Sequence, residues 1–510
     1  MKTLRLLLGD QLNNTHSWFE KTDKNVIYCM FEMQQETNHV VQHIQKVVGF
    51  FAAMRNFAMM LTKNGHEVVY FSISNERNTH SVTDNLSLLI TENNITKFEY
   101  LAPDAYRLDQ QLNDFCNRLS IENAVLETEH FYTSRKELAV FFEGKKQYLM
   151  EHFYRYMRKK HHVLMDGSLP EGGAWNFDKN NRKKWKENTL IPPFKLFQND
   201  VSEILNDLKN ANIKTIGSIG ATNFEYPINR QQAFDQLDYF CTHLLVHFGD
   251  YQDAMHTNQV YLYHSRISFA MNTKMISPKE IIDCVISHYR KHRDEITISQ
   301  VEGFVRQIIG WREYMRGMYW HLMPNYTQLN HLENYNPLPD FYWNGNTKMN
   351  CMKNAISNSL SNGYAHHIQR LMITGNYALL TQTHPDSVDD WYLGIYVDAV
   401  QWVQLPNTRG MSQFADGGMI ATKPYVSSGS YINKMSNYCS DCQYNVKERL
   451  GENACPFNSL YWNFLDDKRP QLANNFRMKM MYSVLNKFSN EELNSMKTRA
   501  LQVIETPENF

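Results

Sequence analysis

The first quarter of the chain alternates short apolar runs with longer amphipathic segments. The apolar runs are candidate strands, at residues 4–8, 26–30, 68–73, 98–101 and 124–126. An amphipathic stretch over about 39–63 predicts a helix that ends at Asn64-Gly65, because glycine readily adopts the left-handed conformation of helix ends. This alternation predicts an α/β domain with a doubly wound parallel sheet, whose ligands bind at the carboxyl ends of the strands.

The pattern changes twice further along the chain. Between about 131 and 200 it becomes basic and aromatic, with the runs 158–160 and 182–186, which are typical both of a solvated linker and of an arm that contacts phosphates. From about 201 onward the apolar spacing is helical. We therefore predict an α/β domain over 1–130, a basic interdomain connector over 131–200 and a larger, all-helical domain over 201–510.

Composition narrows the class of protein. A chain of 510 residues with 43% hydrophobic and 21% charged residues is expected to be globular, with two or more domains. The net charge of −1 means that any binding of nucleic acid must rely on a local basic surface. No apolar run is long enough for a membrane helix, and Gly9-Asp10 interrupt the first one too early for a signal peptide. We expect a soluble, cytoplasmic protein without a membrane partner.

Four of the eight cysteines form a candidate metal site. Cys439, Cys442 and Cys455 follow the pattern C-x2-C-x12-C-P, and Cys351 can supply a fourth thiolate. Thiolates with this spacing suit a [4Fe-4S] cluster, but they would equally suit tetrahedral zinc. A chance arrangement among eight cysteines is the third interpretation.

Three segments resemble the photolyase/cryptochrome family. Residues 263–268, Tyr-His-Ser-Arg-Ile-Ser, resemble the stretch that wraps the flavin phosphates, and residues 305–314 resemble the signature Glu-Leu-x-Trp-Arg-Glu-Phe. The segment from 390 to 418 falls where the family lines the isoalloxazine ring. Two positions depart from the family pattern. His264 replaces the usual Thr or Ser, and Gln307 replaces the signature Glu with an offset of one residue.

The cysteine set singles out one branch of this family, the iron–sulfur bacterial cryptochromes and photolyases, also called prokaryotic (6-4) photolyases. The chain is similar to that branch over essentially its whole length, including the blocks 8–12, 364–370, 405–408 and 423–425. The resemblance implies FAD in the helical domain, a [4Fe-4S] cluster, and a 6,7-dimethyl-8-ribityllumazine antenna in the α/β domain. It implies a (6-4) photolyase, a monomer that uses excited reduced FAD to repair UV-damaged DNA, single- or double-stranded, after the photoproduct flips out.

The resemblance and the residue chemistry assign roles to individual side chains. Repair of a (6-4) adduct requires a proton donor, and histidine can be cationic near neutral pH. His366 and His367 are adjacent on a presumed helix and point about 100° apart, so only one can face a given pocket; we favour His367 and place His366 second.

The remaining expected site residues fall into five groups. The pocket partners of the histidines are Tyr425 and Tyr431; the electron-transfer residues are Trp391, Trp343 and Tyr392; the FAD-binding residues are His264, Ser265, Arg266, Ile267, Ser268, Gln307, Trp311, Arg312, Asp398 and Asn407; the antenna-binding residues are Gly9, Asp10, Gln11 and Glu36; and the cluster ligands are Cys351, Cys439, Cys442 and Cys455.

Two other functions remain open at this stage. A cryptochrome-type blue-light photoreceptor would have the same fold and cofactors but would signal through a partner. A nucleic-acid-binding module held together by zinc would lack photochemistry, so its absorption spectrum would show neither flavin nor iron–sulfur bands. The histidine pair and the basic connector favour repair.

Overall fold

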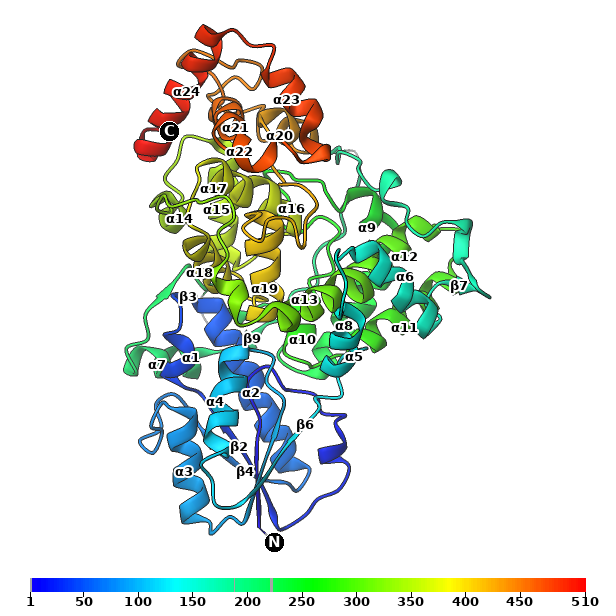
Figure 1. Cartoon of the computed structure of the whole chain (residues 1–510). Coiled ribbons are helices and arrows are strands. Elements are labelled where there is room, and N and C mark those ends of the chain that lie inside the picture. Colours follow the sequence, from blue (N-terminus) through cyan, green and yellow to red (C-terminus); the bar gives the residue numbers. More distant parts are fainter. Residues whose placement is uncertain (1, 188, 221–222) are drawn as a thin grey trace.

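The computed structural model describes residues 2–187, 189–220 and 223–510, and its N-terminal part is built on a five-stranded parallel sheet (Figure 1). The strands are β1 (Thr3–Leu6), β2 (Val26–Phe31), β4 (Glu67–Phe71), β5 (Lys97–Leu101) and β6 (Glu122–Leu126), in the order β4-β2-β1-β5-β6. This confirms the doubly wound sheet expected from the sequence. The strand order reverses at β1, which therefore marks the point where such sheets bind ligands.

Helices cover both faces of the sheet because alternate strand residues point to opposite sides. Leu4 and Leu6 face a small core shared with α3 (Val82–Glu92) and α4 (Tyr106–Cys116). Leu7 and Met30 face α2 (Ile44–Lys63), and this core continues into the helical part of the molecule. The helix α2 stops at Asn64, and Gly65 has a φ of 88°, as the sequence predicts. Its start is later than expected because the ring of His43 caps it by accepting a hydrogen bond from the backbone N–H of Gln45.

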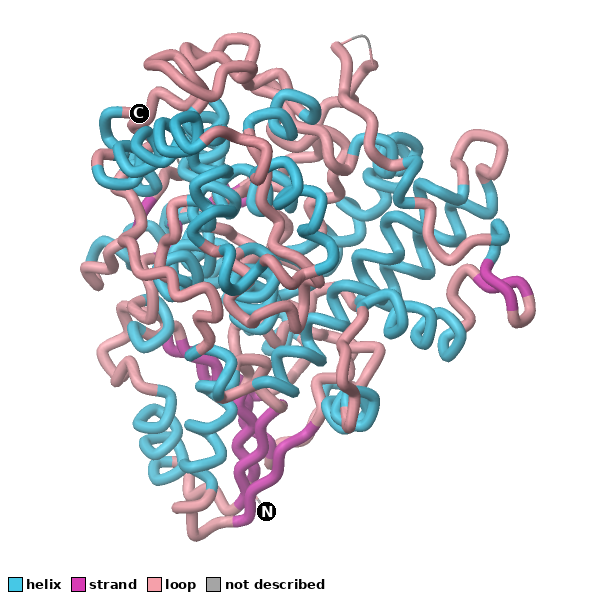
Figure 2. Tube along the Cα trace, turned by 45° about the horizontal axis from the view of Figure 1, so that its top comes forward, coloured by secondary structure: helices cyan, strands magenta, loops and turns pink. Residues whose placement is uncertain are grey.

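The second part of the molecule is mainly helical, as Figure 2 shows by colour. It is not all-helical as predicted, because β10 (Thr215–Ile216) and β11 (Asn223–Phe224) form short strand pairs near its start. Its helices are α7 (Ser202–Asn210), α8 (Arg230–Tyr239), α9 (Leu245–Tyr251), α10 (Ser268–Asn272), α11 (Pro278–Lys291), α12 (Ile298–Val305), α13 (Glu313–Leu322), α14 (Phe341–Asn344), α15 (Asn350–Asn362), α16 (His367–Gln369), α17 (Asn376–Leu380), α18 (Pro385–Ile395), α19 (Gln401–Leu405), α20 (Gly429–Met435), α21 (Pro456–Asp467), α22 (Arg469–Leu472), α23 (Lys479–Leu485) and α24 (Asn490–Glu505). The π-helical turns η4 (Phe240–Leu244), η5 (Arg306–Arg312), η7 (Arg370–Gly375) and η8 (Pro406–Ser412) continue several of them. Such turns are frequent at functional sites, and two of these four, η5 and η8, carry expected flavin residues.

The segment predicted as a basic connector contains more packed structure than a linker. Its helices α5 (Arg135–Phe142) and α6 (Met150–His161) pack against α13 and η5. Arg158, the first residue of the run 158–160, is fully buried and donates to the carbonyls of Val163 and Leu164. Its guanidinium therefore serves the fold and is not available to phosphates, in contrast to the sequence-based interpretation. The boundaries at 130 and 200 stay predictions.

None of the helices within the described ranges is both long and apolar enough to cross a bilayer.

His43 joins the two parts of the molecule, because its ring also bonds the carbonyl of Leu360 at 2.8 Å while capping α2. Burial lowers the pKa of His43 to about 4, although the bond to Leu360 opposes this shift. The unfolded chain, with a histidine pKa near 6.5, binds more protons than the folded chain between these values.

The free energy of unfolding is therefore expected to fall as the pH is lowered from about 6.5 to 4, with His43 contributing up to about 3 kcal/mol. Denaturant titrations at pH 7 and pH 4.5 measure this change for the wild type and for His43→Gln. The variant should be less stable than the wild type at pH 7, with a smaller difference at pH 4.5. An unchanged difference would contradict the assignment.

Candidate functional site

A cavity of about 190 Å³ lies at the carboxyl end of β1, where the strand order reverses. Gly9 and Asp10, which follow β1, line it together with Glu36 from α1 (Gln34–Thr37). Leu393 and Trp402 close it from the helical part of the molecule. Three of the four residues expected to bind an antenna thus surround one cavity between the two halves of the chain.

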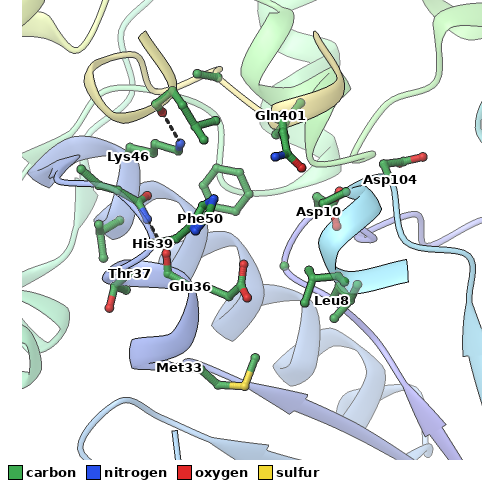
Figure 3. Close-up of a pocket in the computed structure, with 18 of the residues that line it drawn as sticks. Leu8, Asp10, Met33, Glu36, Thr37, His39, Lys46, Phe50, Asp104 and Gln401 are labelled. Atoms are coloured by element: carbon green, nitrogen blue, oxygen red, sulfur yellow. Dashed lines mark hydrogen bonds between the residues drawn. The ribbon is translucent and has the colours of Figure 1, made fainter. Parts of the chain in front are cut away.

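The polar groups of this cavity are paired; Lys46 is buried, and Asp10 and Glu36 are partly buried (Figure 3). The ammonium group of Lys46 donates to the carbonyl of Leu393 at 2.6 Å, and burial lowers the pKa of Lys46 to about 7. Arg107 holds both carboxylate oxygens of Glu36, at 2.9 and 2.8 Å. Burial raises the pKa of Asp10. Together with the aromatic wall, these donors and acceptors suit a flat, polar ring system.

Gln11 does not line the cavity, although we expected it to. Its amide accepts from the backbone N–H of Leu8 and donates to the carbonyl of Leu101. It therefore ties the ends of β1 and β5 together behind the cavity wall. The sequence did not indicate Lys46 or Trp402, since the first lies within an amphipathic helix and the second comes from the other domain.

The expected flavin-phosphate stretch runs into the first turn of α10. The hydroxyl of Ser268 donates to Asp398 at 2.7 Å, and Arg370 donates to the other carboxylate oxygen at 2.9 Å. Arg266 has a φ of 55°, a left-handed conformation that costs a non-glycine residue roughly 1 kcal/mol. Its guanidinium lies over the rings of Tyr226 and Tyr261, 4.4 and 4.1 Å from their centroids. Residues more than a hundred positions apart are thus brought together.

Several polar atoms of this cluster are buried without a hydrogen-bond partner in the described part of the chain. They are Nε and Nη2 of Arg266, Nε2 of His264, Nδ1 and Nε2 of His366, and the hydroxyl of Tyr396. Ser265 and Ile267 bond within the stretch, where the backbone N–H of Ile267 donates to the Ser265 hydroxyl. Because unpaired buried donors are costly, this group of donors fits a polar, anionic ligand such as the diphosphate of FAD.

The two candidate proton donors differ in their surroundings. His366 is buried, precedes α16 as its N-cap and stacks on His264 with centroids 4.7 Å apart. His367 begins α16 and its side chain is exposed. Even so, desolvation and, to a smaller extent, Arg370 lower the pKa of His367 to about 4. The side chain of His367 is therefore the more accessible of the two, although protein atoms around it lower its pKa.

Four other expected flavin residues lie on π-helical turns. Gln307 is exposed and bonds the carbonyl of Gly303, and Asn407 bonds the carbonyl of Val403. Trp311 is half-buried. Arg312 is buried over the ring of Trp402 at 4.5 Å and donates to the carbonyl of Met271 in α10. It therefore lies between α10 and Trp402, which lines the cavity at the end of β1.

Two of the three expected electron-transfer residues, Trp391 and Tyr392, belong to a chain of aromatic rings. The ring of Trp391 lies 5.1 Å from those of both Tyr392 and Tyr342, centroid to centroid. Trp343, the neighbour of Tyr342 on α14, is 40% exposed. At the other end, Tyr392 lies 5.7 Å from Tyr396, which carries Arg370 over its face. The rings thus run from the Arg370–Asp398 pair to Tyr342 on α14, and the sequence did not indicate Tyr342 or Tyr396.

The four expected metal-binding cysteines line one small cavity. Cys351 comes from the first turn of α15 and Cys455 precedes α21, while Cys439 and Cys442 lie on the loop between α20 and α21. Burial, and then the neighbouring thiols, raise the pKa of Cys351 well above its usual value. Gly429 packs so closely that a Cβ there would lie 2.9 Å from Sγ of Cys455.

The structure brings the expected fourth ligand to the other three, although nothing near Cys351 in the sequence marks it. Among the residues described, no three His, Cys, Asp or Glu side chains are grouped closely enough to hold a single metal ion.

A polar rim contains the two expected tyrosines. Tyr425 and Tyr431 are half-buried, and both lie close enough to Arg182 and Asp253 to feel their charges. Burial, with the nearby carboxylate of Asp178, raises the pKa of Asp253 to about 6. The end of the connector thus reaches α20, where Lys184 also donates to the carbonyl of Asn433 at 3.3 Å.

Comparison with known proteins agrees with this arrangement. A family model described as "Deoxyribodipyrimidine photo-lyase-related protein" matches residues 5–224. Over 505 residues the chain is 39% identical to a (6-4) photolyase of Agrobacterium fabrum (strain C58 / ATCC 33970), with 98% of each chain covered. This chain belongs to the bacterial photolyase/cryptochrome family, in its prokaryotic (6-4) photolyase branch.

Solved structures of photolyases and cryptochromes have the same fold. A bacterial class III photolyase from Agrobacterium tumefaciens superposes with a TM-score of 0.57 at 13% identity, covering 100% of this chain and 98% of that one. The cryptochrome of Synechocystis sp. PCC6803 gives 0.55 at 12% identity, covering 97% and 93%. The predicted combination of a parallel-sheet domain with a helical photolyase domain is therefore confirmed.

Proposed function

We propose that this protein is a light-dependent (6-4) photolyase that repairs a flipped-out UV photoproduct by electron transfer from excited reduced FAD. The observation that carries the proposal is the cluster of His264, His366, His367 and Arg370 beside Asp398, with unpartnered donors inside and an accessible histidine at its edge. The 39% identical relative, named a (6-4) photolyase, supports the reaction class.

The phosphates of FAD would be held by Ser265, Ser268 and Arg266, whose guanidinium has two nitrogens without a partner in the described chain. When bound, FAD supplies the light-driven electron. Asp398 and Arg370 form an ion pair next to this stretch. The pair has no net charge, and it would orient a polar ring by hydrogen bonds. Trp391, Tyr392 and Trp343 would return electrons from the surface.

The protein itself would contribute a proton to the reaction, held on the side chain of His367. An extruded (6-4) adduct would enter between His367 and the rim of Tyr425 and Tyr431. Its phosphates would raise the pKa of His367 from about 4 toward neutrality by attraction. His367 could then donate a proton as oxygen moves between the two bases.

The cysteine cavity would hold a [4Fe-4S] cluster on Cys351, Cys439, Cys442 and Cys455. Buried thiols that raise one another's pKa need a strongly cationic group to become thiolates. The four thiols line one small cavity, and four thiolates suit either a [4Fe-4S] cluster or tetrahedral zinc. The similarity of the chain to the iron–sulfur branch of the family favours the cluster.

The cavity at β1 would bind 6,7-dimethyl-8-ribityllumazine. Glu36 and Asp10 offer acceptors, Lys46 offers a donor, and Phe50 and Trp402 offer flat apolar surface. Its place between the sheet and the helical domain is suited to passing excitation energy to a flavin.

The test is a repair assay. The purified, reduced protein is given an oligonucleotide with one (6-4) adduct or one cyclobutane dimer, and product is measured under blue light and in the dark. We expect light-dependent loss of the (6-4) adduct. If neither lesion is converted while the flavin still responds to light, the proposal fails and a photoreceptor becomes the better interpretation.

A further inference from the structure

A stripe of apolar side chains lies exposed near the end of the chain. Phe476 in η9 (Phe476–Met478) is 78% exposed, and Met480 and Val484 in α23 are 74% and 37% exposed. Because they are spaced by four residues, they share one face of the helical segment. The opposite face, with Tyr482 and Leu485, is buried in the core. Several exposed apolar side chains gathered on one face are a candidate contact surface for a partner.

This face adjoins the rim where the lesion would enter. Arg477 donates to the hydroxyl of Thr422 at 2.5 Å, and Asn475 donates to the carbonyl of the same residue at 3.0 Å. The charge of Arg477 reaches both Lys423 and Tyr425. The first turn of the segment is thus fixed next to the loop that carries Tyr425.

The charge of the segment identifies the chemistry of the partner. Of the five basic residues between 468 and 490, Lys468 and Arg469 form ion pairs with Asp467 and Asp466. Arg477, Lys479 and Lys487 are exposed. The ammonium group of Lys479 lies 5.2 Å from the ring centroid of Phe476. Basic side chains interleaved with exposed apolar ones match the phosphates and bases of nucleic acid.

We propose that the face formed by Phe476, Arg477, Lys479 and Met480 is a second DNA contact. Phe476 packs against an unstacked base or its sugar in the duplex flanking the extruded lesion, and Arg477 and Lys479 contact phosphates. An apolar side chain in this position offsets the stacking lost when the lesion leaves the helix. The inference rests on the proposed function and adds to it the protein surface that holds the flanking duplex.

The test measures affinity in the dark, so that it does not depend on turnover. Anisotropy titrations at fixed salt compare a duplex with one (6-4) adduct for the wild type, Phe476→Ala, Phe476→Trp and Tyr335→Ala. Tyr335 is a matched control, because it is an aromatic side chain of similar exposure, 71%, elsewhere on the helical domain. We expect Phe476→Ala to weaken binding of the duplex roughly tenfold. Phe476→Trp and Tyr335→Ala should both bind with the affinity of the wild type.

A second variant tests the charged part of the surface. Arg477→Gln combined with Lys479→Gln should weaken binding and lower the dependence of affinity on salt by about two phosphate contacts. Equal affinity of the wild type and Phe476→Ala would overturn the inference. So would a loss of self-association in Phe476→Ala with unchanged DNA affinity, which would assign the face to a second copy of the chain. Repair by the wild type in the light, measured separately, shows whether the proposed function itself stands.

Discussion

His367→Ala is expected to lower the rate of (6-4) repair by at least about a hundredfold while binding of damaged DNA persists. A positioned general acid contributes factors of this size, and His367 is the accessible member of the histidine cluster. Single-turnover conversion of the adduct under blue light, with the flavin content checked by absorbance, measures the effect.

The pH profile separates a proton donor from a structural residue. Because the acid must be protonated, the wild-type rate should fall as the pH rises above the pKa of His367, which lies at about 4 in the free protein and higher with a lesion bound. The variant should lack this pH dependence.

Two further variants serve as controls for His367→Ala. His292→Ala, at the exposed end of α11, should repair normally. If His367→Ala repairs at the wild-type rate while His366→Ala does not, the donor is the buried histidine and our assignment is wrong.

Cys439→Ala is expected to abolish the broad iron–sulfur absorbance and to destabilise the C-terminal helices. Metal binding of this kind contributes on the order of 10 kcal/mol to folding, and the four ligands join α15 to the segment before α21. We expect the variant to contain less than about a tenth of the wild-type iron and sulfide, and to unfold at a clearly lower temperature. Elemental analysis, sulfide determination and thermal melts measure these changes.

The matched control is Cys116→Ala, which removes a buried thiol from the α/β domain, away from the cavity. It should keep iron and sulfide at the wild-type level. Wild-type protein with one equivalent of zinc and no sulfide would contradict the cluster and leave the zinc alternative.

The sequence predicted most of what depends on local pattern. The five strands, the end of α2 at Asn64 and the helical second half follow from hydrophobic period and glycine geometry. The connector was predicted less well. From the sequence, Arg158 is expected to be an exposed charge, but in the structure its guanidinium donates to backbone carbonyls nearby in the chain.

The site itself needed long-range contacts. The motif at 264–268 could be recognised, but its partners Asp398 and Arg370 are set by the packing of π-helical turns that no local pattern predicts. For the same reason the sequence did not indicate Lys46, Tyr342 and Tyr396, each of which resembles an ordinary core or helix residue.

By itself the sequence determined where strands and helices follow one another along the chain, which residue types are available for chemistry, and the family resemblance. These properties depend on neighbours along the chain. Only the tertiary structure decided that Cys351 joins the other three cysteines, that His367 rather than His366 is accessible, and that the segment of Phe476 lies beside the loop of Tyr425. Those contacts depend on which distant segments pack together. The sequence did not reveal them because the free energy of packing is distributed over the whole core and not over neighbouring residues.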